Sequence, residues 1–111
     1  MKQYVIDELR LEDHARLKTY LDETLGDSGV DGLYWLPLDR EKLAEPQTAH
    51  QGDCGPFFFA LELEESKLVC EFLVRTRERI RCACIQYATE DQRNWLMAVA
   101  DAMLEKLEIA V

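Results

Sequence analysis

Three cysteines and one histidine offer the sulfur and nitrogen atoms with which proteins bind transition metals. Cys82 and Cys84 are separated by one residue, and His50 and Cys54 by three. Four such side chains would make a complete ligand set for Zn²⁺, but structural zinc sites favour Cys-x₂-Cys over Cys-x-Cys. Free cysteine is also among the residue types most often buried. We therefore expect Cys82 and Cys84, together with Cys70, to be core residues, and we predict no metal and no other cofactor.

A nucleophilic cysteine is the second chemistry that these residues suggest. Cys54 lies in the sequence Gly-Asp-Cys-Gly, and His50 precedes it in the same segment, so a Cys–His dyad is conceivable. Such a dyad also needs an orienting acid and an oxyanion hole, which no nearby residue supplies. We predict no catalytic residue, and we favour a protein without enzymatic activity.

Four arginines occupy alternate positions within a stretch of seven residues: Arg75, Arg77, Arg79 and Arg81. Clustered guanidinium groups hold carboxylates and phosphates through paired hydrogen bonds. The alternative is charge neutralisation by acids on neighbouring strand positions, namely Glu62, Glu71 and Glu78. We predict that the arginines, with Trp35, His50 and Cys54, bind a ligand or a partner.

The elements that must position these residues centre on the stretch from 57 to 87. Apolar residues alternate there in three runs, which predicts an antiparallel meander with one face in the core: Phe57 to Leu63, Leu68 to Val74, and Ile80 to Cys84. Helical spacing predicts a first helix from about Glu12 to Leu25 and a last helix after the capping box Thr89-Glu90-Asp91-Gln92. The residues before the first helix are compatible with a short extended piece.

Between the first helix and the meander, the pattern predicts a strand, a single helical turn and a loop. The strand covers residues 30–38, and because Pro37 cannot donate to a ladder, it either lies at an edge of the sheet or ends at Leu36. The helical turn covers 39–44, and 46–56 is the loop. The prediction is an α+β two-layer sandwich of order α-β-β-β-β-α, with a three- to four-stranded sheet and both helices on one face. Residues 1–111 form a single domain.

Charge and composition limit the partners and the compartment. The 22 acidic residues outnumber the 13 basic ones and give a net charge of −9, which disfavours nucleic acid and anionic membranes. The first residues show no secretory signal, no apolar run is long enough to span a bilayer, and the cysteines suit a reducing compartment, so we expect a cytoplasmic protein.

The outer face of the predicted meander carries apolar residues where polar ones are usual: Phe58, Val69, Leu73, Ala83, Ile85 and Tyr87. The Tyr34-to-Leu38 segment, the long loop or a second copy of the chain would cover this face, and of these we favour the second copy, a homodimer. The arginine turn and the 46–56 loop would bind a protein partner. The favoured function is a small interaction or regulatory module. The alternative is a protein that binds an anionic small molecule, or an enzyme, with a pocket at the 39–56 loop. In that case Arg75 or Arg81 would hold the anion, and a Cys/His metal site would be an option.

Overall fold

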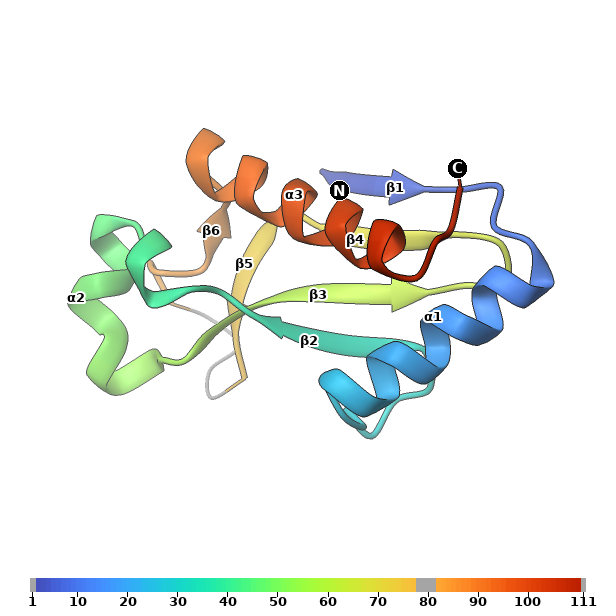
Figure 1. Cartoon of the computed structure of the whole chain (residues 1–111). Helices are drawn as coiled ribbons and strands as arrows, with labels where there is room; N and C mark the ends of the chain where they lie inside the picture. Colours follow the sequence, from blue (N-terminus) through green and yellow to red (C-terminus); the bar gives the residue numbers. More distant parts are fainter. Residues whose placement is uncertain (1, 78–81, 111) are drawn as a thin grey trace.

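An antiparallel sheet and three α-helices build this protein, for which the computed structural model describes residues 2–77 and 82–110 (Figure 1). A three-residue 3-10 helix at Arg40–Lys42 precedes the second α-helix. The other elements of the described part are, in chain order, β1 (Gln3–Ile6), α1 (Leu11–Thr24), β2 (Leu33–Pro37), α2 (Glu45–Cys54), β3 (Phe57–Leu63), β4 (Leu68–Glu71), β5 (Leu73–Thr76), β6 (Gln86–Tyr87) and α3 (Glu90–Lys106).

β3 is the centre of the sheet. β2 pairs along one edge of β3, in a register that places Trp35 opposite Ala60. Along the other edge, β4 pairs with the second half of β3 and β5 with its first half. β1 and β6 complete the sheet by pairing with β4 and β5, and all the pairings are antiparallel. The predicted α+β two-layer sandwich is confirmed, although the described residues form six strands rather than three or four.

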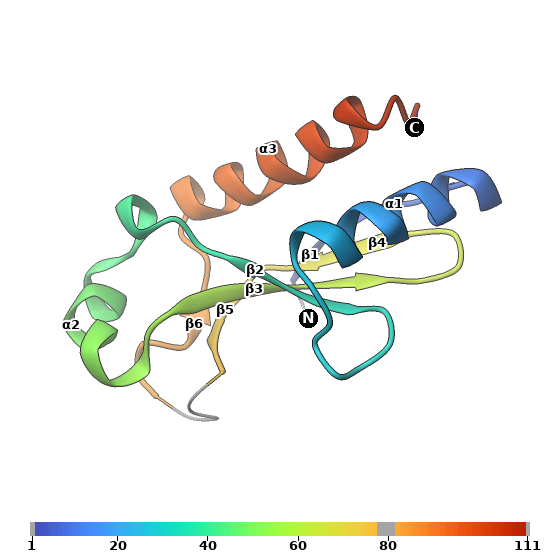
Figure 2. The same cartoon turned by 60° about the horizontal axis from the view of Figure 1, so that its bottom comes forward.

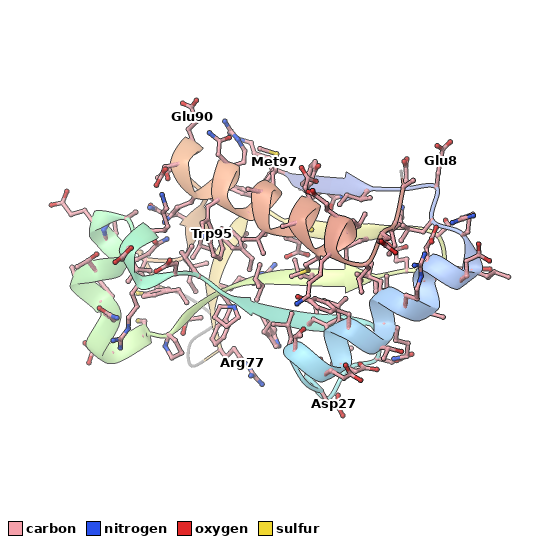
Figure 3. All side chains as sticks on the ribbon, viewed as in Figure 1. Glu8, Asp27, Arg77, Glu90, Trp95 and Met97 are labelled. Carbon is pink, nitrogen blue, oxygen red and sulfur yellow. The ribbon has the colours of Figure 1, made fainter. Side chains whose placement is uncertain are left out.

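α1 and α3 both cover the same face of this sheet, as predicted (Figure 2). The alternation in β3 places Phe57, Phe59, Leu61 and Leu63 in the core, where all four are buried. Phe59 stacks against Trp95 of α3, with ring centroids 6.2 Å apart (Figure 3). Leu17 and Leu21 of α1, and Leu96 and Leu104 of α3, close the core from the helical side.

Helix α3 begins at the predicted capping box. The Thr89 hydroxyl accepts a hydrogen bond from the Gln92 backbone N–H at 3.2 Å, and the Gln92 side-chain oxygen accepts one from the Thr89 N–H at 3.0 Å. These two bonds satisfy donors that a helix start leaves without intrahelical partners. Gln92 is nevertheless buried, so its amide group also has to find partners inside the protein.

Two sequence-based predictions are wrong. Residues 46–56 contain the helix α2 instead of a loop, because Pro46 lies in its first turn, where a missing N–H costs no hydrogen bond. Cys84 lies in a turn rather than on a third strand, and the strand of this region is the short β6. Arg79, Ile80 and Arg81, on which other predictions rest, lie outside the described residues.

The face of the sheet opposite α1 and α3 is partly apolar, as the alternation predicts. Trp35, Phe58 and Leu73 are half-buried there, Val69 is buried, and Tyr87 is 41% exposed. In the described part of the chain, no helix has the length and apolar character needed to cross a bilayer.

Candidate metal centre

Helix α2 supplies the first two side chains of the candidate site. His50 and Cys54 are four residues apart on this helix, so their side chains lie on the same face, about one turn from each other. Cys54 is 2% exposed, whereas His50 is only half-buried. The last turn of α2 lies beyond one end of the sheet (Figure 1). There it meets the segment that leads into β6.

That segment supplies the other two side chains. The Ile85 backbone N–H donates to the Cys82 carbonyl oxygen at 3.0 Å and closes a tight turn around residues 82–85. Cys84 is fully buried, and Cys82 is partly exposed. The expectation that cysteines fill the core therefore holds for Cys70 and Cys84 but not for Cys82.

The four side chains converge on one point. One donor atom from each of His50, Cys54, Cys82 and Cys84 lies within 4.8 Å of the other three. The Cys54 and Cys82 sulfur atoms are 3.4 Å apart, and the Cys82 sulfur is 3.1 Å from Nδ1 of His50. A tetrahedral zinc ion with sulfur ligands at 2.3 Å would space them about 3.8 Å apart. The cluster therefore has nearly the dimensions of a zinc tetrahedron.

The pKa values of two of the cysteines are shifted in opposite directions. Hydrogen bonds from the Cys84 side chain and backbone N–H, with weaker help from Cys54 and His50, lower the pKa of the Cys82 thiol to about 6. Burial, followed by the neighbouring sulfur groups, raises the pKa of the Cys84 thiol to about 12. Cys82 is thus more easily ionised than Cys84, and a bound cation would supply the charge that favours ionisation of the Cys84 thiol.

Buried polar side chains tie this cluster to the rest of the fold. Gln47, one turn before His50, donates to the Cys84 carbonyl oxygen at 3.5 Å. The Gln47 side-chain oxygen accepts from the Gln92 amide at 2.8 Å, and the same amide also donates to the Lys42 carbonyl oxygen at 2.8 Å. The chain of hydrogen bonds therefore runs from α3 through α2 to the cysteine turn.

The strand β5 adds a further link. The Thr76 hydroxyl, which is buried, donates a hydrogen bond to the Cys54 carbonyl oxygen. This bond fixes the end of α2 against β5. Metal sites in proteins regularly include groups that do not bind the metal but hold its ligands in position through hydrogen bonds.

The structure divides the sequence-predicted site residues into two groups. His50 and Cys54 belong to the cluster with Cys82 and Cys84. Trp35 instead lines a different cavity, together with Arg75 and Arg77. Arg79 and Arg81 lie outside the described residues.

Sequence reasoning missed the buried glutamines. Gln92 was recognised only as half of a capping box, and Gln47 gave no signal, because an isolated glutamine in a segment without apolar periodicity predicts an exposed side chain. Their role depends on contacts between residues 45 positions apart in the chain. No local pattern contains that information.

Comparison of the chain with models of known protein families, with curated proteins and with solved structures finds no match.

Proposed function

We propose that this chain is a small zinc-binding module without catalytic activity, in which His50, Cys54, Cys82 and Cys84 hold one Zn²⁺ ion. The convergence of the four donor atoms within 4.8 Å carries the proposal. Zinc suits this set because it takes thiolate and imidazole ligands in tetrahedral geometry. The proposal departs from the expectation, drawn from the Cys-x-Cys spacing, that no metal is bound.

The number of ligands favours a structural role for the ion. Catalytic zinc sites keep one position open for water or substrate, whereas four protein ligands close the coordination sphere. Cys82 and Cys84 come from a turn far from α2 in the chain, since Cys54 and Cys82 are 28 positions apart. A zinc ion between them would join the two segments and contribute its binding energy to the folded state.

The state of the thiols supports a reducing environment. In the described part of the chain, no disulfide joins any of the four cysteines. Zinc binding requires thiolates, which an oxidising compartment would convert to disulfides. We therefore include a cytoplasmic location in the proposal, together with a role as an interaction module. The homodimer expected from the sequence stays a prediction.

Metal analysis of the purified protein tests the proposal. We expect one zinc ion per chain from zinc-supplemented expression. On replacement by Co²⁺, we expect the intense visible absorption of a tetrahedral ion and a thiolate-to-cobalt charge-transfer band. Cys82→Ala and His50→Ala should each weaken zinc binding at least tenfold, as measured by competition with a chromophoric chelator.

Cys70→Ala is the matched control, because Cys70 is a buried cysteine that does not belong to the cluster. This variant should keep its zinc and its cobalt spectrum. A wild-type protein that neither retains zinc nor gives a tetrahedral cobalt spectrum would refute the proposal. Equal metal binding by the Cys82 and Cys70 variants would do the same.

A further inference from the structure

The sheet face that α1 and α3 leave open contains a cavity of about 410 Å³. β2 contributes Leu33 and Trp35, which alternate with the buried Tyr34 and Leu36 and therefore point away from the core. Leu73, Ile85 and Val30 complete the apolar part of the lining. This volume is typical of pockets for small molecules, which are mostly apolar with a few polar groups.

Two arginines line the same cavity but differ in their partners. The Arg75 guanidinium is 3.0 Å from the Glu71 carboxylate and is neutralised by it. Arg77 lies over the rings of Trp35 and Phe58, at 5.8 and 6.0 Å from their centroids. In the described part of the chain, no carboxylate lies within ion-pair distance of Arg77. Its charge is therefore available to a ligand.

The position of Arg77 suits this role. A second cavity, of about 150 Å³, adjoins the first and shares Ser28, Trp35 and Arg77 with it. Figure 3 shows Arg77 on the side of the sheet where the loop with Asp27 lies, and Asp27 also lines this second cavity. A cation–π contact with aromatic rings uses no N–H donor of the guanidinium, so these donors can still bind an anion.

We propose that this groove binds a small organic anion, with an aromatic or aliphatic body against Trp35 and Leu73 and a carboxylate, sulfonate or phosphate group on Arg77. Among the described residues that line the larger cavity, Arg77 is the one charged group without a carboxylate partner, and Asp27 lines only the smaller adjoining cavity. A second copy of the chain is a poorer occupant, because each copy carries a net charge of −9 and two copies repel. This site shares none of the four metal ligands, although Ile85, whose N–H closes the cysteine turn, also lines it.

Two dyes of similar shape test the proposal on the zinc-supplemented full chain. Anilinonaphthalene sulfonate carries an aromatic body and a sulfonate, and N-phenylnaphthylamine carries nearly the same body without the charge. We expect the anionic dye to bind at least tenfold more tightly, as measured by fluorescence titration. Backbone NMR shifts should change around the groove and not in α1, and near-ultraviolet circular dichroism should confirm that the protein remains native.

Arg77→Gln removes the charge and keeps a shorter side chain that can still donate hydrogen bonds. We expect it to weaken the anionic dye about tenfold, which is the effect of losing one charge-assisted hydrogen bond of about 1.4 kcal/mol, and to change the neutral dye less than twofold. Lys67→Gln is the matched control, because Lys67 lies next to Glu64 in the turn between β3 and β4 and its loss changes the net charge equally. It should leave both affinities unchanged.

Three results would overturn the proposal. Equal affinity of the two dyes would show an apolar groove without anion selectivity, and equal affinities of the Arg77 and Lys67 variants would show that the guanidinium takes no part. A dimer by light scattering, with dye binding that rises on dilution, would show that a second copy occupies the groove. Failure of the zinc tests leaves these measurements unaffected in the metal-free protein, provided that it is folded.

Discussion

Replacing Gln47 by alanine tests whether the polar chain between α3 and the cysteine turn positions the metal ligands. Gln47 is fully buried. Its side-chain oxygen accepts hydrogen bonds from the Ala44 backbone N–H at 2.9 Å and from the Gln92 amide at 2.8 Å. Its amide nitrogen donates to the Cys84 carbonyl oxygen at 3.5 Å, the longest of the three bonds. The substitution removes all three bonds at once.

The loss of stability follows from the groups that are left behind. A buried donor or acceptor without a partner costs about 1–3 kcal/mol. Ala44 is only half-buried, so water can reach its N–H, whereas the Gln92 amide is enclosed and keeps one of its two bonds, to Lys42. We therefore expect a loss of about 3 kcal/mol in the free energy of unfolding of the metal-free protein. For a domain of this size, that corresponds to a fall in Tm of roughly 10–20 °C.

The effect on zinc should be additional. Removal of a group that orients a metal ligand typically lowers metal affinity by about 10–100-fold. Since zinc binds only the folded state, the stabilisation that zinc confers on the variant should shrink by about 1.4–2.8 kcal/mol relative to the wild type. Urea unfolding with and without buffered zinc measures both quantities. Chelator competition measures the zinc affinity independently.

Gln51→Ala is the control, because Gln51 is a half-exposed glutamine of the same helix. It should change neither stability nor zinc affinity appreciably. If Gln47→Ala lowers the stability of the metal-free and zinc-loaded proteins equally, with an unchanged zinc affinity, then Gln47 is a core residue and positions nothing. If it leaves the stability unchanged as well, the hydrogen-bond chain itself is refuted.

Two further predictions concern the scaffold. Hydrogen bonds from Arg10 hold the pKa of the buried Asp13 carboxyl at about 2, below its ordinary value of 3.8. A carboxyl whose pKa is lower in the folded than in the unfolded protein adds stability at pH values above its unfolded pKa, and this contribution is lost as the pH falls toward 2. The free energy of unfolding of the metal-free protein should therefore depend less on pH between pH 5 and 2 in Asp13→Asn than in the wild type. Parallel plots of this free energy against pH for the two proteins would contradict the prediction. Gly32 has φ +79°, and a Cβ there would lie 2.9 Å from the Leu63 carbonyl oxygen, whereas Gly26 has φ +78° and open space around it. Gly26→Ala should cost about 1 kcal/mol in thermal or urea unfolding, and Gly32→Ala clearly more, because only the second adds a clash to the strain; equal losses would show that the clash is relieved.

The parts of the fold that sequence patterns predict are those whose signals are local. The strand β3 and its hairpin follow from alternating residues such as Phe59 and Leu61, and α3 follows from the Thr89 capping box and its apolar stripe. The pairing of β1 with β4 has no such signal, because it joins residues as distant as Gln3 and Glu71. The sheet is therefore wider than the meander that alternation predicts.

The candidate site shows the same division. The sequence identifies His50, Cys54, Cys82 and Cys84 as metal-binding residue types, but the Cys-x-Cys spacing and the frequent burial of free cysteine argue against a metal. Two cysteines separated by one residue look the same in the sequence whether they lie on a strand or in a turn. Only the tertiary structure shows that this pair lies in a turn whose side chains point toward α2. A ligand set split between two distant segments has no diagnostic spacing, because each half contributes only two ligands.

The energetics of α2 explain why a metal would be retained at this place. A helix of ten residues is marginal on its own, and most helices in proteins are stabilised by an apolar face against the core. The side chains that α2 buries are Gln47 and Cys54, one amide and one thiol, so apolar burial contributes little to holding it. Its stability comes instead from the hydrogen bonds of Gln47 and from the bond between Thr76 and Cys54, and the proposed zinc ion would add ligation at the cluster. Zinc would hold α2 against the rest of the fold, as the apolar stripes of α1 and α3 hold those helices against the sheet.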